Sequence, residues 1–198
     1  MPYWAESPAI GDFERYLARE VVGHVDGAFR TRAERSFRAV CGFSMGGHGA
    51  LKVGMKSSGV FAQIGSLSGS PLSMRYRKPI YQKALVGQAR PGSLKELVET
   101  VTFESNWTLA AVYAKAAAFS PNPGRPPLFL DLPFQATSSS EEREPIWKKW
   151  LDDDPLSLVA RSREALSSMD QIYIDHGRRS SGSGPRTSCA SWSATASA

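Results

Sequence analysis

The sequence predicts an α/β fold in which helices pack against an incomplete, mainly parallel β-sheet. Over residues 14–69 the apolar patterns alternate between helix and strand. Such alternation gives parallel strands joined by right-handed crossovers. In addition, the apolar run at 37–43 leads straight into a glycine-rich turn and a second helix. A turn of this kind places a polar side chain above the edge of a parallel sheet.

The N-terminal part of the chain supplies two helices and two strands. The spacing of apolar residues predicts an amphipathic helix over 14–29. Its expected buried face carries Tyr16, Leu17, Val21, Val22 and Val25. Next come a strand at 37–43, a helix over 45–55 that begins with small residues, and a second strand at 61–69.

The C-terminal part contains more helix than strand. Residues 94–119 are predicted to be helical with an interruption near 105–107, and the proline-rich run 120–127 ends that helix. The remaining expected elements are a strand at 128–132, helices over 145–151 and 156–165, and a final strand at 171–177 that ends in a turn.

The composition changes abruptly after Gly177. We therefore expect one incomplete domain over 1–177 and a disordered tail over 178–198. The tail has seven serines and no Leu, Ile, Val, Phe or Met, so it has almost nothing to bury. Such a composition is typical of an out-of-frame reading of GC-rich DNA. Our hypothesis is a gene fragment, shortened in front and frame-shifted after Gly177, which esterase-like codons in another frame nearby would support.

Charge and cysteine usage exclude several classes of protein. The net charge is +5, but three arginines lie in the tail and the other cations alternate with acids, so we expect no nucleic-acid partner. No apolar run is long enough to span a bilayer, and the N-terminus lacks the pattern of a signal peptide. We expect a cytoplasmic product without membrane contact. Cys41 and Cys189 are far apart, and Cys41 is expected to be a small buried hydrophobe.

The segment Gly42-Phe43-Ser44-Met45-Gly46 matches Gly-x-Ser-x-Gly, the nucleophile elbow. In this motif a sharp strand-to-helix turn holds the serine in a strained conformation. Gly42 and Gly46 would allow strand and helix to approach closely. The backbone N–H of Met45, at the start of the helix, would bind an oxyanion.

Several further segments, together with this elbow, resemble the esterase family that includes esterase D (S-formylglutathione hydrolase), feruloyl esterases and the antigen 85 mycolyltransferases. The most specific match is the extended elbow, Gly42 to Leu51, and His48 belongs to it as a structural residue. The other matching segments are 3–8, 13–17, 28–31, 61–69 and 118–122. The resemblance spans residues 3–177. It implies a three-layer α/β-hydrolase-like sandwich and a carboxylic-ester hydrolase with a Ser-His-Asp triad.

The chain departs from the family pattern at the triad acid and histidine. The family acid stands in a motif resembling Asp-Cys-Gly-x-x-Asp, and Ser180 occupies its position here. His176 ends a strand and is our candidate base, with Asp175 as the nearest carboxylate and Asp131 as an alternative acid. Because neighbouring strand residues point to opposite faces, Asp175 and His176 do not readily form one relay. The third histidine, His24, is expected to be a half-exposed helix residue.

We therefore expect a serine esterase that cleaves short-chain acyl esters through an acyl-Ser44 intermediate, at low activity and without a metal or cofactor. The alternatives are a non-catalytic remnant, an acyltransferase of the mycolyltransferase type, and a purely structural protein. An incomplete sheet would expose an edge, so we also expect a homo-oligomer. Weaker candidates for substrate contact are the strand-end serines Ser66, Ser68 and Ser70 and the helix pair Trp147 and Trp150, which more often pack as core. Asp152 to Asp154 is expected to be a solvated turn.

Overall fold

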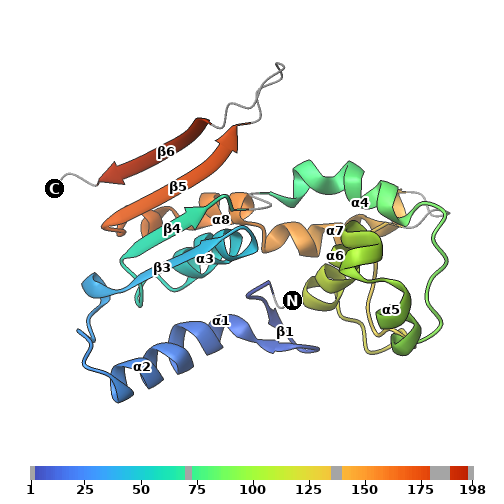
Figure 1. Cartoon of the computed structure of the whole chain (residues 1–198), viewed down its shortest axis with the longest axis horizontal. Helices are drawn as coiled ribbons and strands as arrows, with labels where there is room; N and C mark the ends of the chain where they lie inside the picture. Colours follow the sequence, from blue (N-terminus) through green and yellow to red (C-terminus); the bar gives the residue numbers. More distant parts are fainter. Residues whose placement is uncertain (1–2, 70–72, 135–139, 179–187, 196–198) are drawn as a thin grey trace. The chain divides into compact units, whose positions relative to one another are not determined.

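The computed structural model describes residues 3–69, 73–134, 140–178 and 188–195 (Figure 1). The chain divides into two compact units. One combines the first 13 residues with 73–154, and the other combines 14–72 with 155–198. The second unit contains the predicted strand–elbow–helix segment and is called the sheet unit below; the first is called the helical unit.

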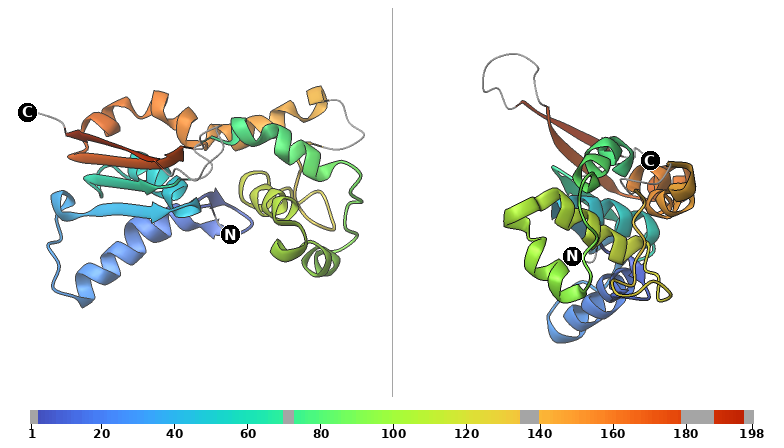
Figure 2. Two further views of the ribbon diagram at one scale, coloured as in Figure 1. Left: turned by 45° about the horizontal axis from the view of Figure 1, so that its top comes forward. Right: turned by 90° about the vertical axis from the view of Figure 1, so that its right-hand side faces the viewer.

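The sheet unit is built on four strands in the order β3 (Ala39–Phe43), β4 (Gln63–Leu67), β5 (Gln171–Arg178) and β6 (Ser188–Thr195). The first three strands are parallel, and β6 is antiparallel to β5. Figures 1 and 2 show the four strands side by side in this order. The predicted α/β class with a mainly parallel sheet is therefore confirmed.

Helix α3 (Met45–Lys56) connects β3 to β4 and packs on both strands. Every residue of α3 from Gly47 to Met55 is buried. A side chain at Gly54 would lie 2.4 Å from Cγ1 of Ile64, so the helix axis can approach β4 closely at this point. Helices α8 (Pro155–Arg161) and α9 (Arg163–Ser167) contact α3 in turn. The core of this unit thus lies on the α3 side of the sheet.

The opposite side of β3 is open. Along this strand Val40 is buried, whereas Ala39, Cys41 and Phe43 are exposed. The expectation that Cys41 is buried was therefore wrong. Side chains alternate along a strand, and only the alternate set that includes Val40 faces α3.

The predicted helix over 14–29 forms as α1 (Phe13–Arg15), a π-helical segment η1 (Tyr16–Val21) and α2 (Val22–Ala28). Its predicted buried face was wrong, because in this helix only Ala18 is buried, while Tyr16 and Val25 are exposed. A π-helical turn bonds each residue to the fifth along the chain. It therefore rotates the following residues out of the stripe that a 3.6-residue period predicts. A short 3₁₀ turn, η2 (Arg35–Phe37), precedes β3.

The helical unit contains a two-stranded sheet of β1 (Glu6–Ser7) and β2 (Gly11–Asp12). Its helices are the 3₁₀ turn η3 (Met74–Arg77), α4 (Lys78–Leu85), α5 (Leu94–Thr100), α6 (Phe103–Phe119) and α7 (Ser140–Asp152). The sequence did not indicate β1, β2, η3 or α4. The predicted interruption in 94–119 is confirmed, because α5 ends at Thr100 and Asn106 has non-helical dihedral angles.

The strand predicted at 128–132 was wrong. Only an isolated bridge joins Pro121 to Leu130. The segment is instead closed as a loop, since the Ser120 hydroxyl donates to the Asp131 carbonyl at 2.6 Å and the Asp131 N–H donates to the Ser120 carbonyl at 2.9 Å. These bonds satisfy the backbone locally, so no partner strand is needed.

Trp147 and Trp150 on α7 pack as core, as expected of helix neighbours. They are 3% and 0% exposed, and their ring centroids lie 5.9 Å apart. The Trp150 indole N–H donates to the Ser120 hydroxyl at 2.9 Å. At the end of this helix, Asp154 is buried and accepts a hydrogen bond from the Met74 N–H at 2.7 Å. The expectation of a fully solvated turn at 152–154 was therefore wrong for Asp154.

Strand β6 lies within the tail for which the sequence predicted disorder, so β5 is not the final strand. It pairs with β5 in continuous antiparallel register from Gln171↔Thr195 to Arg178↔Ser188. Ladder hydrogen bonds use backbone groups, so a segment poor in apolar residues can extend a sheet edge. In the part of the chain that the structure describes, no helix is both long and apolar enough to cross a bilayer.

Candidate active site

Ser44 joins β3 to α3 in a conformation that non-glycine residues rarely adopt. Its backbone has φ 54° and ψ −117°, and the helix begins at the next residue. A side chain in this region costs on the order of 1–3 kcal/mol and persists only where the surroundings hold it. The Ser44 hydroxyl does not cap α3. The geometry is that of a nucleophile elbow, in which the serine side chain is lifted out of both flanking elements.

The two elbow glycines have different roles. A side chain on Gly42 would come within 2.4 Å of the backbone carbon and oxygen of Gly46, so only glycine fits at that position. A side chain on Gly46 would meet nothing within 4 Å. The close approach of strand and helix therefore requires glycine at Gly42 alone. The expectation that both positions exclude a side chain for this reason was wrong for Gly46.

Two further glycines, which sequence reasoning missed, let the end of β4 pack against the start of α3. A side chain on Gly47 would lie 2.8 Å from the Gly69 Cα, and one on Gly69 would lie 2.3 Å from the Ser66 hydroxyl. Ser66 is fully buried beneath this contact, and its hydroxyl has no hydrogen-bond partner among the described residues. Ser66 is therefore no longer a candidate for substrate contact. The sequence signal for this contact was the glycine that directly follows the elbow motif, Gly47, together with Gly69 after the next strand.

The carboxyl ends of the three parallel strands form one edge. The Ser44 N–H donates to the Leu67 carbonyl at 2.9 Å, and the Ser68 N–H donates to the Asp175 carbonyl at 2.8 Å. Phe43, Leu67 and Asp175 are in register across the sheet. Ser44 and Asp175 therefore lie at the same edge of the sheet, with strand β4 between them.

Two strand spacings separate Ser44 from Asp175, which is on the order of 10 Å. This is too far for a direct hydrogen bond between the two side chains, and leaves room for an intervening ring. The Ser68 hydroxyl donates to the Asp175 carboxylate at 3.5 Å, a long hydrogen bond. Ser68 also has a positive φ of 46°. Sequence reasoning named Ser68 as a weak candidate but did not place it beside Asp175.

The start of α3 supplies backbone donors. The first hydrogen bond within the helix runs from the His48 N–H to the Ser44 carbonyl at 3.2 Å. Helix geometry therefore provides no acceptor inside α3 for the N–H of Met45. This N–H and the helix dipole favour negative charge beside Ser44. His48 is 1% exposed in the first turns of α3, and its structural role stays a prediction.

The other candidates are placed as follows. His176 follows Asp175 in β5 and pairs with Ala190 of β6, but its side chain lies outside the described part of the structure. His24 is exposed on α2. Ser70 lies outside the described residues.

Asp131 lies in the helical unit and is already engaged. It accepts hydrogen bonds from Arg125 and from the Asn122 amide, the latter at 2.7 Å. Burial raises the pKa of this carboxyl, but the hydrogen bonds from Arg125 and Asn122 and the charges of Arg125 and Arg143 outweigh burial and lower its pKa overall. Asp131 therefore stabilises its own loop.

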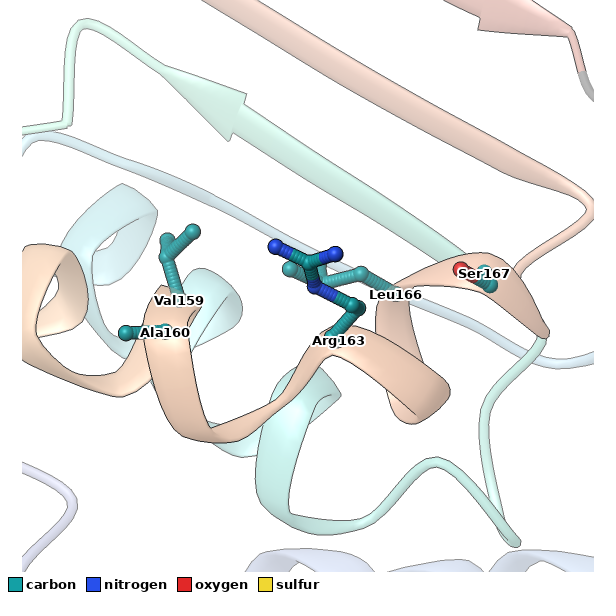
Figure 3. Close-up of a pocket in the computed structure, with 5 residues that line it drawn as sticks. All are labelled: Val159, Ala160, Arg163, Leu166 and Ser167. Atoms are coloured by element: carbon teal, nitrogen blue, oxygen red, sulfur yellow. The ribbon is translucent and has the colours of Figure 1, made fainter.

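A pocket of about 320 Å³ lies in the sheet unit between α8 and α9 (Figure 3). Figure 3 shows the Arg163 guanidinium reaching over the pocket between Val159 and Leu166. The residues that line it, Val159, Ala160, Arg163, Leu166 and Ser167, do not include any residue of the Ser44 edge. This pocket is therefore separate from the candidate nucleophile.

Comparison with known proteins agrees with the resemblance carried by the elbow. A family model described as "Putative esterase" matches residues 3–198, which extends past Gly177 into the tail. Two curated proteins of Mycobacterium tuberculosis are similar to part of the chain: Esterase MT1326 of strain CDC 1551 / Oshkosh and Esterase Rv1288 of strain ATCC 25618 / H37Rv. Each is 45% identical over 64 residues, which is 32% of this chain, and the chain spans only 14% of the length of each relative. Because the family model covers nearly the whole chain, the protein belongs to the Putative esterase family.

Proposed function

We propose that the protein hydrolyses short-chain carboxylic esters with Ser44 as nucleophile. The observation that carries this proposal is the backbone of Ser44, whose φ of 54° is held between β3 and α3. Strain of this kind is maintained where it exposes a reacting atom. Membership of an esterase family gives the reaction class.

In the proposed reaction, the Ser44 oxygen attacks the carbonyl carbon of the ester while a base removes the hydroxyl proton. The carbonyl oxygen becomes an oxyanion, which the Met45 N–H at the start of α3 stabilises. A donor of this type contributes roughly 10²–10³ in rate. The intermediate collapses, the bond to the alcohol oxygen breaks, and the alcohol leaves with the proton. Water then attacks the acyl-Ser44 ester by the same steps and releases the acid.

The base and acid are part of the same proposal. His176 is the proposed base, because it directly follows Asp175 in β5, whereas His24 is exposed on α2 and His48 is buried in α3. Asp175 is the proposed acid, and its position at the Ser44 edge with Ser68 beside it supports this role. Because neighbouring strand residues point to opposite faces, a direct hydrogen bond between Asp175 and His176 is not part of the proposal. A serine hydrolase without an effective base retains roughly 10³–10⁴ over water, so low turnover is expected.

The test compares p-nitrophenyl acetate turnover and fluorophosphonate labelling in the wild type and Ser44→Ala. We expect turnover and covalent labelling to be lost in Ser44→Ala and kept in Ser36→Ala, a matched change at an exposed serine before β3. A wild type that neither turns over nor labels would reject the proposal and favour a non-catalytic protein.

His176→Ala tests the base separately. If Ser44 acts with His176, this variant should lose turnover to the level of Ser44→Ala while the protein remains folded. Unchanged turnover in His176→Ala would reject His176 as the base and leave Ser44 as the nucleophile. An acyl acceptor alcohol added to the same assay distinguishes acyl transfer, since it would raise the release of p-nitrophenol and form a new ester.

A further inference from the structure

Ser68 directly follows β4 and links the strand ends on either side of it. Its N–H donates to the Asp175 carbonyl at 2.8 Å, and the carbonyl of the preceding residue, Leu67, accepts from the Ser44 N–H at 2.9 Å. Leu67 and Asp175 are the last pair in the register of β4 with β5, so the Ser68 bond extends that ladder by one residue. The backbone at the end of β4 therefore fixes the separation of the candidate nucleophile from the proposed acid.

The backbone of Ser68 departs from that of a strand. Among the described residues of the sheet unit, Ser44 and Ser68 are the non-glycine residues with a positive φ, at 54° and 46°. In a strand that continued straight, Ser68 would point its side chain to the face opposite Leu67. Leu67 is paired with Asp175, so a straight strand would carry the Ser68 hydroxyl away from the carboxylate. With the positive φ, the hydroxyl instead donates to the Asp175 carboxylate at 3.5 Å.

The residue after Ser68 holds this conformation in place. Gly69 is buried against the first turn of α3, where a side chain on it would lie 3.2 Å from the Gly47 carbonyl carbon and 2.3 Å from the Ser66 hydroxyl. The chain therefore leaves β4 toward α3 directly after Ser68. Glycine would adopt the same φ at no steric cost, whereas serine is strained there. Strain of this kind concentrates at functional sites, which points to a task for the Ser68 side chain.

We infer that Ser68 is a positioning residue, whose hydroxyl holds the Asp175 carboxylate at the Ser44 edge during ester hydrolysis. This inference rests on the proposed function, because the task of Ser68 is tied to the reaction at Ser44. The hydroxyl donates, the carboxylate accepts, and no proton changes place between them. Hydrogen bonds among catalytic groups are often long in a free enzyme and shorten when substrate binds, which accommodates the 3.5 Å separation. Ser68 acts through Asp175 and does not itself contact the ester.

Ser68→Gly separates this task from a purely structural one. Glycine accepts a positive φ, so the urea midpoint should equal or exceed that of the wild type. The Asp175 carboxylate loses its donor, so kcat for p-nitrophenyl acetate should fall roughly 10-fold, since a misplaced catalytic group can cost up to about 10²-fold. KM should stay unchanged, because Ser68 does not bind the ester. Wild-type kcat in a more stable Ser68→Gly variant would overturn the inference.

Ser68→Asn is the conservative variant that should rescue turnover. Asparagine is enriched among non-glycine residues at positive φ, and its longer side chain carries an amide that donates to a carboxylate. Its kcat should therefore lie well above that of Ser68→Gly. The matched control is Ser36→Gly, the same change at the exposed serine before β3, and its kcat should equal that of the wild type. If Ser68→Asn is as slow as Ser68→Gly, a hydrogen-bond donor at this position is not what supports turnover.

A double-mutant cycle tests whether Ser68 acts through Asp175. In an Asp175→Asn background, Ser68→Gly should lower kcat by less than about 2-fold, because the group that it positions has already been changed. A further loss as large as in the wild-type background would show that Ser68 acts independently of Asp175. The wild type separates this inference from the proposed function. If it neither turns over nor reacts with the fluorophosphonate probe, both are wrong. If it does both and Ser68→Gly matches it, only the positioning role is wrong.

Discussion

The Ser44 N–H donates a 2.9 Å hydrogen bond to the carbonyl of Leu67. This bond continues the β3–β4 ladder one residue beyond the end of β3, where the chain already turns into α3. It therefore fixes the strained serine to the sheet edge from one side, while the helix fixes it from the other. The position of Ser44 is thus set by the packing of strands and helix together.

Replacement of Gly42 tests this packing. Gly42→Ala would place a methyl group 2.4 Å from the backbone of Gly46. Backbone atoms cannot rotate away, so we expect a destabilisation of about 1–3 kcal/mol, measured by urea unfolding. Loss of fluorophosphonate labelling at Ser44 should accompany it. Gly46→Ala is the matched control, because its methyl group meets open space and alanine favours helix by up to about 1 kcal/mol. If Gly42→Ala and Gly46→Ala have similar stability, the close contact is not confined to a side chain at position 42.

The strain at Ser44 predicts an unusual order of stability among inactive variants. Glycine adopts a positive φ without steric cost, whereas alanine keeps the Cβ that causes the strain. We expect Ser44→Gly to be more stable than Ser44→Ala by about 1 kcal/mol in chemical unfolding. A Ser-to-Gly change at the exposed Ser36 should show no such gain over Ser-to-Ala. If Ser44→Ala proves the more stable, the strained backbone is not retained in solution.

The contact between α3 and β4 predicts a coupled pair. Gly54→Ala would place its methyl group 2.4 Å from the Ile64 side chain, and overpacking should cost about 1–3 kcal/mol. Ile64→Ala removes the atoms that clash but leaves a cavity, at about 2–5 kcal/mol. The double variant should be more stable than the sum of the two losses predicts, by at least about 0.5 kcal/mol. Strict additivity in urea unfolding would show that the two residues do not touch.

Lys115 in the helical unit predicts a pH dependence of stability. Lys115 is 3% exposed, and its amine donates to the Tyr3 hydroxyl at 2.6 Å. Burial, with a smaller contribution from the charge of Arg77, lowers the pKa of Lys115 from 10.5 to about 7. Between these two values the unfolded chain binds a proton that the folded chain lacks, so the free energy of unfolding rises with pH across this window. The full shift corresponds to at most on the order of 5 kcal/mol.

The measurement is urea unfolding from pH 7 to 9.5. Below about pH 7 the folded amine is protonated too, and this contribution no longer changes. Near pH 10 the burial of Tyr3, which raises its pKa to about 12, begins to act in the opposite direction. Lys115→Met should flatten the rise, whereas Lys148→Met, at a side chain that is 75% exposed, should leave it intact. If the free energy of unfolding still rises with pH in Lys115→Met, another titrating group causes the rise.

Local patterns predicted the elements that carry the candidate nucleophile. The apolar run before Ser44 and the small residues after it correctly indicated β3 and α3, because each element is buried on the face that its own period defines. The break near Asn106 was also visible in the sequence. The strand expected at 128–132 failed, since local hydrogen bonds from Ser120 and Asp131 close that segment as a loop.

Properties that depend on distant neighbours could not be predicted in this way. The exposure of Cys41 depends on which face of β3 the helix α3 covers. The need for glycine at 47 and 69 arises only because two segments 22 positions apart in sequence come into contact. Strand β6 depends on the open edge of β5, which its own composition does not reveal.

By itself the sequence determined the order of the central elements, the glycine-flanked serine and the family to which the chain belongs, because these depend on residues close together in the chain. Only the tertiary structure decided that Ser44 is held at φ 54° and that Asp175 lies at the same edge two strands away. It also decided that β3, β4 and β5 are neighbours in the sheet in this order. The physical reason is that strain, distance across a sheet and exposure are set by parallel strand pairing and helix packing, which join segments that are remote in sequence.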